Sequence, residues 1–453
     1  MTVIDDHPKN SSIMTTFLGI ILGMFGISIM QLVLATAMPF IVTEIGGDYL
    51  YGWVFSSYML ASLLTIPVFS KLADLYGKKK FYLLGMGIFA IGTLYGGLAP
   101  SMEHLIVARV IQGLGAGMMI PVSIALISDL FPAEKRGAMI GGLSFIQLLA
   151  NILSPILGSV ITKQLGWHWI FYITLVMIVL AMLLVARAKQ AAQVSQGIRW
   201  LEIDLIGGLV FGVFCALTVS FSNAFSGQNK LGVTGVLLLV GAIITAIILV
   251  WNERRHKDPI IKVAFFKTKI LRRSILSSLV AGGIMYGLVT ILPLCGVVLK
   301  QQGFNIDESK ILMLFMLGIT FGLLIASRLV TKLNANFPKI LWGASVLSAG
   351  LMYYAVSVSN LLMFYIVTGV LGLFLGGIMA TLLINSQNAV SSEDRTVLSG
   401  LVQLGRYLGA AIGVTILTGM LPEVSQISAA AQFLGAFGLL VGIYILGLVN
   451  ELI

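Results

Sequence analysis

The chain has 453 residues and a net charge of +10, yet 58% of its residues are hydrophobic and only 10% are charged. Soluble domains carry about 25% charged residues, so this chain has too few charges to cover a water-exposed surface. The composition therefore indicates a protein of the lipid bilayer and excludes an ordinary soluble domain. The two cysteines and four histidines show no spacing typical of a disulfide framework or a metal site, and we expect no cofactor.

Fourteen apolar segments have the roughly 20 residues that a membrane-spanning helix needs. In chain order they are 14–42, 50–70, 81–99, 103–128, 138–161, 168–188, 204–223, 232–252, 274–299, 309–329, 339–358, 361–386, 396–420 and 430–450. The sequence therefore predicts an all-α integral membrane protein with fourteen transmembrane helices. An even number of spans places both termini on the same side of the membrane.

The distribution of basic residues supports this arrangement. Lys and Arg collect in the cytoplasmic loops of membrane proteins. With the N-terminus inside, the inner segments hold 22 of the 28 basic residues and the outer segments hold 4. We therefore expect a multi-pass protein of the cell membrane with both termini in the cytoplasm. The net positive charge is then a consequence of topology, and no nucleic-acid partner is expected.

Two polar linkers, at 189–203 and 253–273, divide the predicted spans. They bracket the seventh and eighth spans and leave six spans on either side. The sequence therefore predicts an N-terminal bundle at 1–190, two extra helices at 191–255 and a C-terminal bundle at 256–453.

Three stretches carry motifs of a known family. The loop after the second span reads SKLADLYGKKK (70–80), the fourth span contains RVIQGLGAG (109–117), and the fifth contains NILSPILGS (151–159). They resemble the signature loop, the Arg-x-x-Gln-Gly motif and the Gly-Pro-x-x-Gly antiporter motif of the major facilitator superfamily, with Ser70, Ser154 and Ser159 in place of glycines. With fourteen spans, the chain resembles the fourteen-helix drug:proton antiporters of this superfamily.

This resemblance implies a fold and a mechanism. It implies two six-helix bundles plus two extra central helices, and a monomer that exports amphiphilic small molecules by alternating access, with protons as the coupling ion. It also implies a set of residues that latch the cytoplasmic side in the outward-facing state: Asp74, Gly77, Lys78, Asp129 and Arg136. The alternative for these charges is a role in setting topology only.

Pro155 and Gly158 mark the fifth span as a place for bending and close contact. Proline removes a backbone donor and bends a helix, and small residues let membrane helices approach closely. Structural packing explains both residues, and a hinge is the sharper hypothesis.

The coupling acid is missing from the first span. The family often has a carboxylate in this stretch, and aligning its proline with Pro39 places the acid at Met30. All 18 acidic residues of the chain lie outside the middle of the predicted spans. Gln31 and Thr36 are the polar residues that remain in this stretch, and we expect them to line a substrate cavity.

Two arginines lie within spans. Arg109 is about 9 Å deep, and we expect it to line the substrate cavity, the alternative being that it extends outward to the membrane surface. Arg406 is about 15 Å deep, where a lone arginine costs about 2.5–3.5 kcal/mol. We expect a cavity-facing Arg406, the alternative being a structural cation bonded within the protein. Other candidates for the cavity are Gln112, Gln147, Asn151, Asn385 and Gln403. Amides and cations without an anion suit neutral or anionic amphiphiles better than dicationic drugs.

The sequence thus predicts a secondary-active exporter of the multidrug type in the lipid bilayer. The alternative is an uncoupled facilitator or a lipid-type flippase for neutral or anionic amphiphiles. A receptor or scaffold is a third hypothesis, from another class. An enzyme is not expected, because no nucleophile–base set occurs at membrane depth, and no Gly-x-x-x-x-Gly-Lys-Ser/Thr motif for ATP is present.

Overall fold

The protein is described here from a computed structural model. The structure describes residues 10–187, 204–226, 232–255, 263–304, 308–330, 336–390, 395–422, 427 and 429–452. Within these ranges the regular structure is entirely helical, with three short 3-10 turns at Asp48–Leu50, Val263–Lys267 and Ala430–Phe433. The polar linker at 189–203 lies outside the described residues.

Fourteen α-helices occupy the described ranges, one at each predicted span. Their bounds are α1 Asn10–Ile45, α2 Tyr51–Tyr76, α3 Lys78–Gly97, α4 Met102–Leu130, α5 Ala133–Leu165, α6 His168–Arg187, α7 Leu205–Ser226, α8 Val233–Arg255, α9 Lys269–Gln301, α10 Glu308–Leu329, α11 Phe337–Ser357, α12 Leu361–Asn388, α13 Arg395–Gly419 and α14 Leu434–Leu452.

Twelve of these helices are long and apolar enough to cross a membrane, by length and composition, among the residues that the structure describes. The two that fall short are α3 and α7. Helix α3 begins with three lysines and is rich in glycine. In α7, the part whose side chains the structure describes, Gly207–Ser222, is apolar but shorter than a full span. The helices coincide with the fourteen predicted spans, but the count of fourteen membrane crossings is not confirmed.

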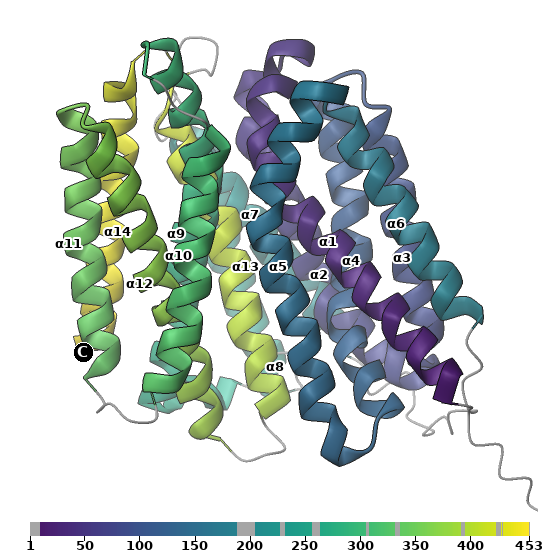
Figure 1. The fold of residues 1–453 in the computed structure, drawn as a ribbon. Helices are drawn as coiled ribbons and strands as arrows, with labels where there is room; N and C mark the ends of the chain where they lie inside the picture. The colour runs from purple at the N-terminus through teal and green to yellow at the C-terminus, as the bar shows by residue number, and fades with distance from the viewer. Residues whose placement is uncertain are drawn as a thin grey trace, which may run out of the picture.

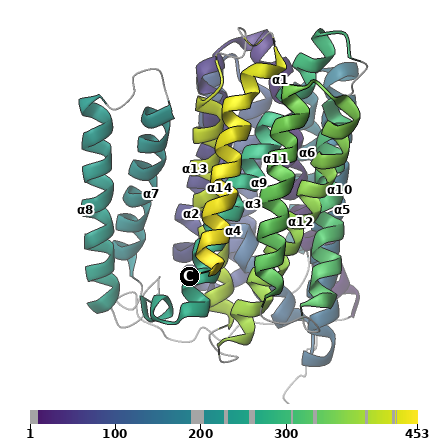
Figure 2. The ribbon, with the colours of Figure 1, turned by 90° about the vertical axis from the view of Figure 1, so that its left-hand side faces the viewer.

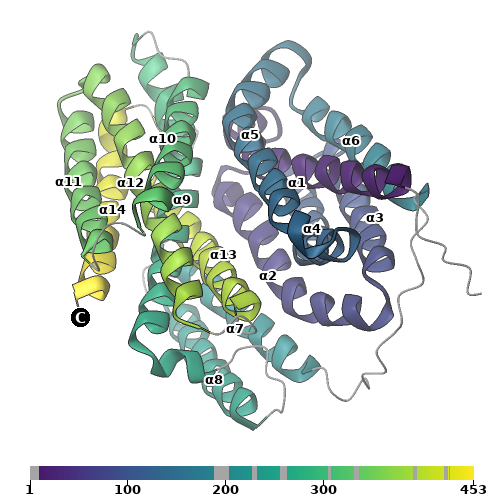
Figure 3. The same cartoon turned by 60° about the horizontal axis from the view of Figure 1, so that its bottom comes forward.

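The helices gather in two groups with a third pair at the side (Figures 1 and 3). In the first group α1 packs on α5 and α6, and α4 packs on α2 and α3. In the second group α9 packs on α13, α10 on α12, and α11 on α14. Helix α7 contacts α2 and α13, and α8 stands outside it, away from both groups (Figure 2). The start of α1 and the end of α14 lie at the same end of the molecule, here called the terminal end (Figure 1).

Glycines set the closest helix contacts in the second group. A Cβ atom on Gly409 of α13 would lie 1.8 Å from the carbonyl oxygen of Leu279 in α9, and one on Gly376 of α12 would lie 2.0 Å from the carbonyl oxygen of Ile319 in α10. Side chains cannot occupy such space, so these helices touch backbone to backbone. This packing holds helices rigidly within the group.

Candidate functional site

Gln31 of α1 joins the two groups of helices. It lies well inside its helix, and its Nε2 donates a hydrogen bond of 2.7 Å to the hydroxyl of Tyr286 in α9. Tyr407 of α13 is also within hydrogen-bonding reach of Gln31. The amide that the sequence places beside the missing acid therefore bridges the molecule, while Met30 itself is fully buried.

Six polar or aromatic side chains surround this bridge, and we call them the central cluster. They share mutual interactions and come from both groups of helices: Gln31 from α1, Tyr58 from α2, Tyr286 from α9, and Gln403, Arg406 and Tyr407 from α13. Tyr58 interacts electrostatically with both other tyrosines. The cluster contains one guanidinium, two amides and three phenols. No carboxylate among the described residues belongs to it.

Arg406 supplies the charge of the central cluster. Its Nη2 donates a hydrogen bond to Oε1 of Gln403, one turn earlier on α13. Its Nε is buried and has no hydrogen-bond partner among the described residues. An unsatisfied buried donor is costly, and such groups in native proteins usually await a ligand or water. That Arg406 faces a substrate cavity stays a prediction.

Arg109 lies behind the central cluster, inside the first group. It is 1% exposed, its Nε donates to the carbonyl of Val54 at 3.1 Å, and its Nη1 donates to Gln112 at 2.8 Å. Gln112 in turn donates to Thr93 of α3 at 2.9 Å. The guanidinium carbon also lies 4.1 Å from the ring centroid of Tyr58, a cation–π distance. Arg109 and Gln112 therefore tie α2, α3 and α4 together and do not extend to the membrane surface.

Replacing Arg109 with lysine is expected to lower the apparent melting temperature in detergent. Lysine keeps the charge but cannot donate to Val54 and Gln112 together, so a buried acceptor loses its partner at a cost of roughly 1–3 kcal/mol. The matched control is Arg187→Lys, at an exposed position at the end of α6. Equal melting of the two variants would contradict a structural role for Arg109.

Among the described residues, the other predicted cavity residues form no hydrogen bond with the central cluster. The hydroxyl of Thr36 donates to the carbonyl of Val33, and a Cβ on Gly158 would lie 2.1 Å from that hydroxyl oxygen, so both residues serve the contact of α1 with α5. Gln147 and Asn151 of α5 and Asn385 of α12 are partly exposed. No hydrogen bond between described residues joins these three amides to the cluster.

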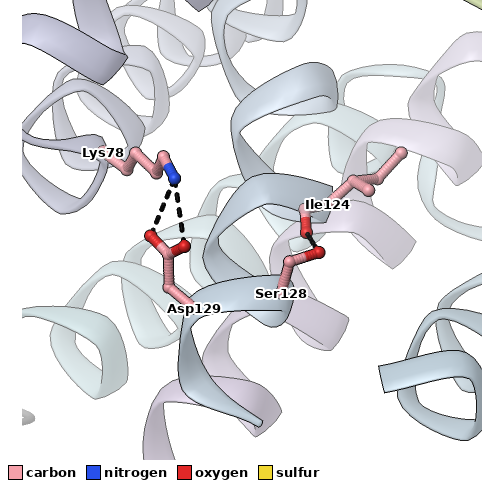
Figure 4. Close-up of polar contacts among 4 residues, drawn as sticks. All are labelled: Lys78, Ile124, Ser128 and Asp129. Carbon is pink, nitrogen blue, oxygen red and sulfur yellow. Dashed lines mark hydrogen bonds and ion pairs between the residues drawn. The ribbon is translucent and has the colours of Figure 1, made fainter. Parts of the chain in front are cut away.

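The predicted latch residues form an ion pair within the first group. Lys78 at the start of α3 pairs with Asp129 near the end of α4 at 2.8 Å (Figure 4). Arg136 instead donates its Nε to the carbonyl of Phe131, and Gly77 ends α2 with a φ of 105°. The side chain of Asp74 lies outside the described part of the structure. A latch between the two groups stays a prediction, as does a hinge at Pro155, where α5 continues without interruption.

The side-chain hydrogen bonds that join described residues of the two groups lie away from the terminal end. Besides the Gln31–Tyr286 bond, Tyr51 of α2 donates to the carbonyl of Thr290 at 3.0 Å, and Ser56 of α2 donates to the carbonyl of Ala411 in α13 at 3.1 Å. A cavity of about 350 Å³ lies at the same end, between Ile156–Gln164 of α5 and Ser309–Met313 of α10. The groups are therefore in contact at mid-depth and at the end opposite the termini.

Comparison with known proteins settles the family. Residues 16–414 match the sequence model of the Major Facilitator Superfamily. The chain belongs to this superfamily. This facilitator is therefore an integral membrane transporter of many spans, and it is not an enzyme.

Two curated relatives of this facilitator come from Bacillus subtilis (strain 168). Multidrug resistance protein 3 is 31% identical over 74% of the chain and 64% of its own length. The multidrug transporter protein MdtP is 29% identical over 88% of the chain and 73% of its own length. Among solved structures, a peptide transporter POT in complex with sulfate aligns with a TM-score of 0.70, at 18% identity, over 99% of the chain and 95% of its own. The last comparison concerns the fold alone.

Sequence reasoning missed the three tyrosines of the central cluster. Tyrosine is enriched at the two membrane–water interfaces, so tyrosines deep within spans were a usable signal. Tyr58, Tyr286 and Tyr407 each lie at least seven residues inside a helix. The hydroxyl groups of Tyr286 and Tyr407 supply contacts to Gln31 that the amide count alone did not reveal.

Proposed function

We propose that this facilitator is a monomer of the cell membrane that exports amphiphilic small molecules by alternating access, with both termini in the cytoplasm and fourteen spans in two bundles and a pair at the side. The observation that carries the proposal is the central cluster, because its members come from both groups of helices. A site built across two moving bodies is exposed to either side in turn as they rock. The names of the two Bacillus relatives support a small-molecule substrate.

The contacts between the groups support a particular conformation. The hydrogen bonds that join described residues of the two groups lie at mid-depth or toward the end opposite the termini. If the terminal end is cytoplasmic, the groups are closed on the outer side.

We further propose that a proton gradient drives export, as the family resemblance implies. The acid would lie outside the central cluster. Glu44 accepts a hydrogen bond of 3.0 Å from Trp167, Glu103 accepts one of 2.6 Å from Ser101, and Asp129 pairs with Lys78. All three acids lie near helix ends, where water reaches them, and each is a candidate for coupling.

Transport by purified protein in liposomes tests both parts of the proposal. With a pH gradient across the membrane, we expect an amphiphilic fluorescent compound to move against its own concentration gradient. Collapse of the gradient with a protonophore is expected to stop uphill movement. The controls are protein-free liposomes and liposomes that hold heat-denatured protein.

The outcomes separate the hypotheses. Downhill movement at a rate that does not depend on the pH gradient would favour uncoupled transport. It would contradict proton coupling but would still show that the protein transports the compound. An absence of protein-dependent movement for cationic, neutral and anionic compounds alike would contradict the proposal that the chain exports amphiphiles.

A further inference from the structure

The central cluster contains an unusual imbalance of charge at depth. Arg406 lies near the middle of α13, about 16 Å from its start and about 20 Å from its end at 1.5 Å per residue. Among the described residues, no carboxylate forms an ion pair with its guanidinium, and Gln403 is its hydrogen-bond acceptor. Intramembrane charges usually pair with one another or face a water-filled path, so a bound anion is the natural complement of this arginine.

Two buried donors of the cluster give their protons to no acceptor among the described residues. One is the Nε of Arg406, and the other is the hydroxyl of Tyr58, whose side chain is 1% exposed and whose oxygen lies within reach of the Ser62 hydroxyl. Ser62, one turn from Tyr58, gives its hydroxyl proton to backbone carbonyls, at 2.9 Å to that of Tyr58 and at 3.0 Å to that of Gly113. The two donors without acceptors come from opposite groups of helices, as expected for a ligand held between them.

The surroundings of these donors disfavour a cation. Arg109 lies against the ring of Tyr58, with its guanidinium carbon 4.1 Å from the ring centroid, so a second positive charge stands directly behind the cluster. Tyr286 and Tyr407 complete the surroundings with hydroxyl groups and with aromatic faces, which by themselves would attract a cation, so the rejection of cations rests on the two arginines. Phenol groups and a guanidinium suit an oxyanion, and aromatic rings suit a flat apolar body.

We propose that the central cluster selects amphiphiles with a single carboxylate or similar oxyanion attached to an aromatic or apolar body, and that Arg406 binds the anionic headgroup. This inference rests on the proposed function, because it names the substrate class of the same site. Tyr58 donates to the same headgroup from the opposite group of helices. An amphiphile with a quaternary ammonium headgroup is rejected.

The test uses three probes that share the same pyrene body and differ only in the headgroup. They are pyrenebutyrate, pyrenebutanol and a pyrenebutyl-trimethylammonium salt. Binding is measured by equilibrium dialysis against protein in detergent, with protein-free micelles subtracted. Wild type is expected to bind the carboxylate about tenfold more tightly than the ammonium probe, the ratio for one charge-assisted hydrogen bond. Equal binding, or preference for the ammonium probe, would overturn the proposal.

Variants assign the effect to Arg406. Arg406→Gln is expected to lower carboxylate affinity about tenfold and leave the affinity for the alcohol unchanged, which also shows that the variant is folded. Arg406→Lys should retain part of the preference, and Tyr58→Phe should weaken carboxylate binding less than Arg406→Gln does. Arg254→Gln, which removes an exposed charge at the end of α8, is the matched control. Unchanged carboxylate binding by Arg406→Gln would overturn the proposal.

The binding assay and the transport assay can contradict the two proposals independently of each other. If the probes bind in the expected order but none is moved in liposomes, the export proposal is contradicted and the headgroup preference stands. If the ammonium probe is transported and Arg406→Gln transports it equally well, export stands and the role assigned to Arg406 is contradicted.

Discussion

Oxidation of a variant that carries Gly52→Cys and Thr418→Cys is expected to reduce transport to the level of protein-free liposomes, and reduction is expected to restore it. A Cβ atom on Gly52 of α2 would lie 3.5 Å from the Cβ of Thr418 in α13. Cβ atoms in disulfides are about 3.5–4.5 Å apart, so the two positions suit a disulfide without backbone movement. The bond would join the two groups of helices where alternating access requires them to separate.

Controls distinguish a loss of transport caused by the disulfide from a loss caused by the substitutions or by the oxidant. Thr418→Cys alone should transport before and after oxidation, because it has no partner. The native cysteines, Cys215 and Cys295, are buried and are not expected to react. The disulfide is verified by mass spectrometry of the linked peptides. Full transport by a protein shown to be cross-linked would contradict the proposal that α2 and α13 move apart.

Replacement of Gly409 with alanine is expected to cause a large loss of stability. The added Cβ would lie 1.8 Å from the carbonyl oxygen of Leu279, a backbone atom that cannot rotate away. Overpacking of this kind typically costs about 1–3 kcal/mol and occasionally more, and here it would force α9 and α13 apart. We expect a lower apparent melting temperature and a lower yield of folded protein in detergent.

The same helix offers a matched control. A Cβ on Gly400 of α13 would meet nothing within 4 Å, so Gly400→Ala should be neutral or stabilising, as alanine is about 0.5–1 kcal/mol better than glycine within a helix. Both variants are compared by thermal unfolding and size-exclusion chromatography. If Gly409→Ala melts no lower than Gly400→Ala, the backbone contact of α9 with α13 does not contribute as described.

Hydropathy predicted the helices well because the bilayer imposes one length and one composition on every span. The predicted segment 396–420, for example, differs from α13 by one residue at either end. Hydropathy is weaker where a span is short of apolar residues. The lysines at the start of α3 lower the hydropathy of that helix, and the count of fourteen crossings remains a proposal.

The candidate site was less predictable, because hydropathy does not say which side of a span faces which neighbour. Helix α4 is apolar around its whole circumference, so no amphipathic stripe shows where Arg109 points. Arg109 and Gln112 are three residues apart on one helical face, and the structure shows them hydrogen-bonded to each other inside the first group. The link from Gln31 to Tyr286 spans 255 residues, and no local pattern could reveal it.

The hydrogen bonds between the groups have a kinetic consequence. Tyr51 and Ser56 each use one hydroxyl to donate to a backbone carbonyl, and water can replace either bond directly. Each such bond contributes about 0.5–1.5 kcal/mol net. Opening should therefore meet a low barrier, within the microsecond to millisecond range of domain motions. Turnover would then be limited by loading or release of cargo, and the gate itself would be fast.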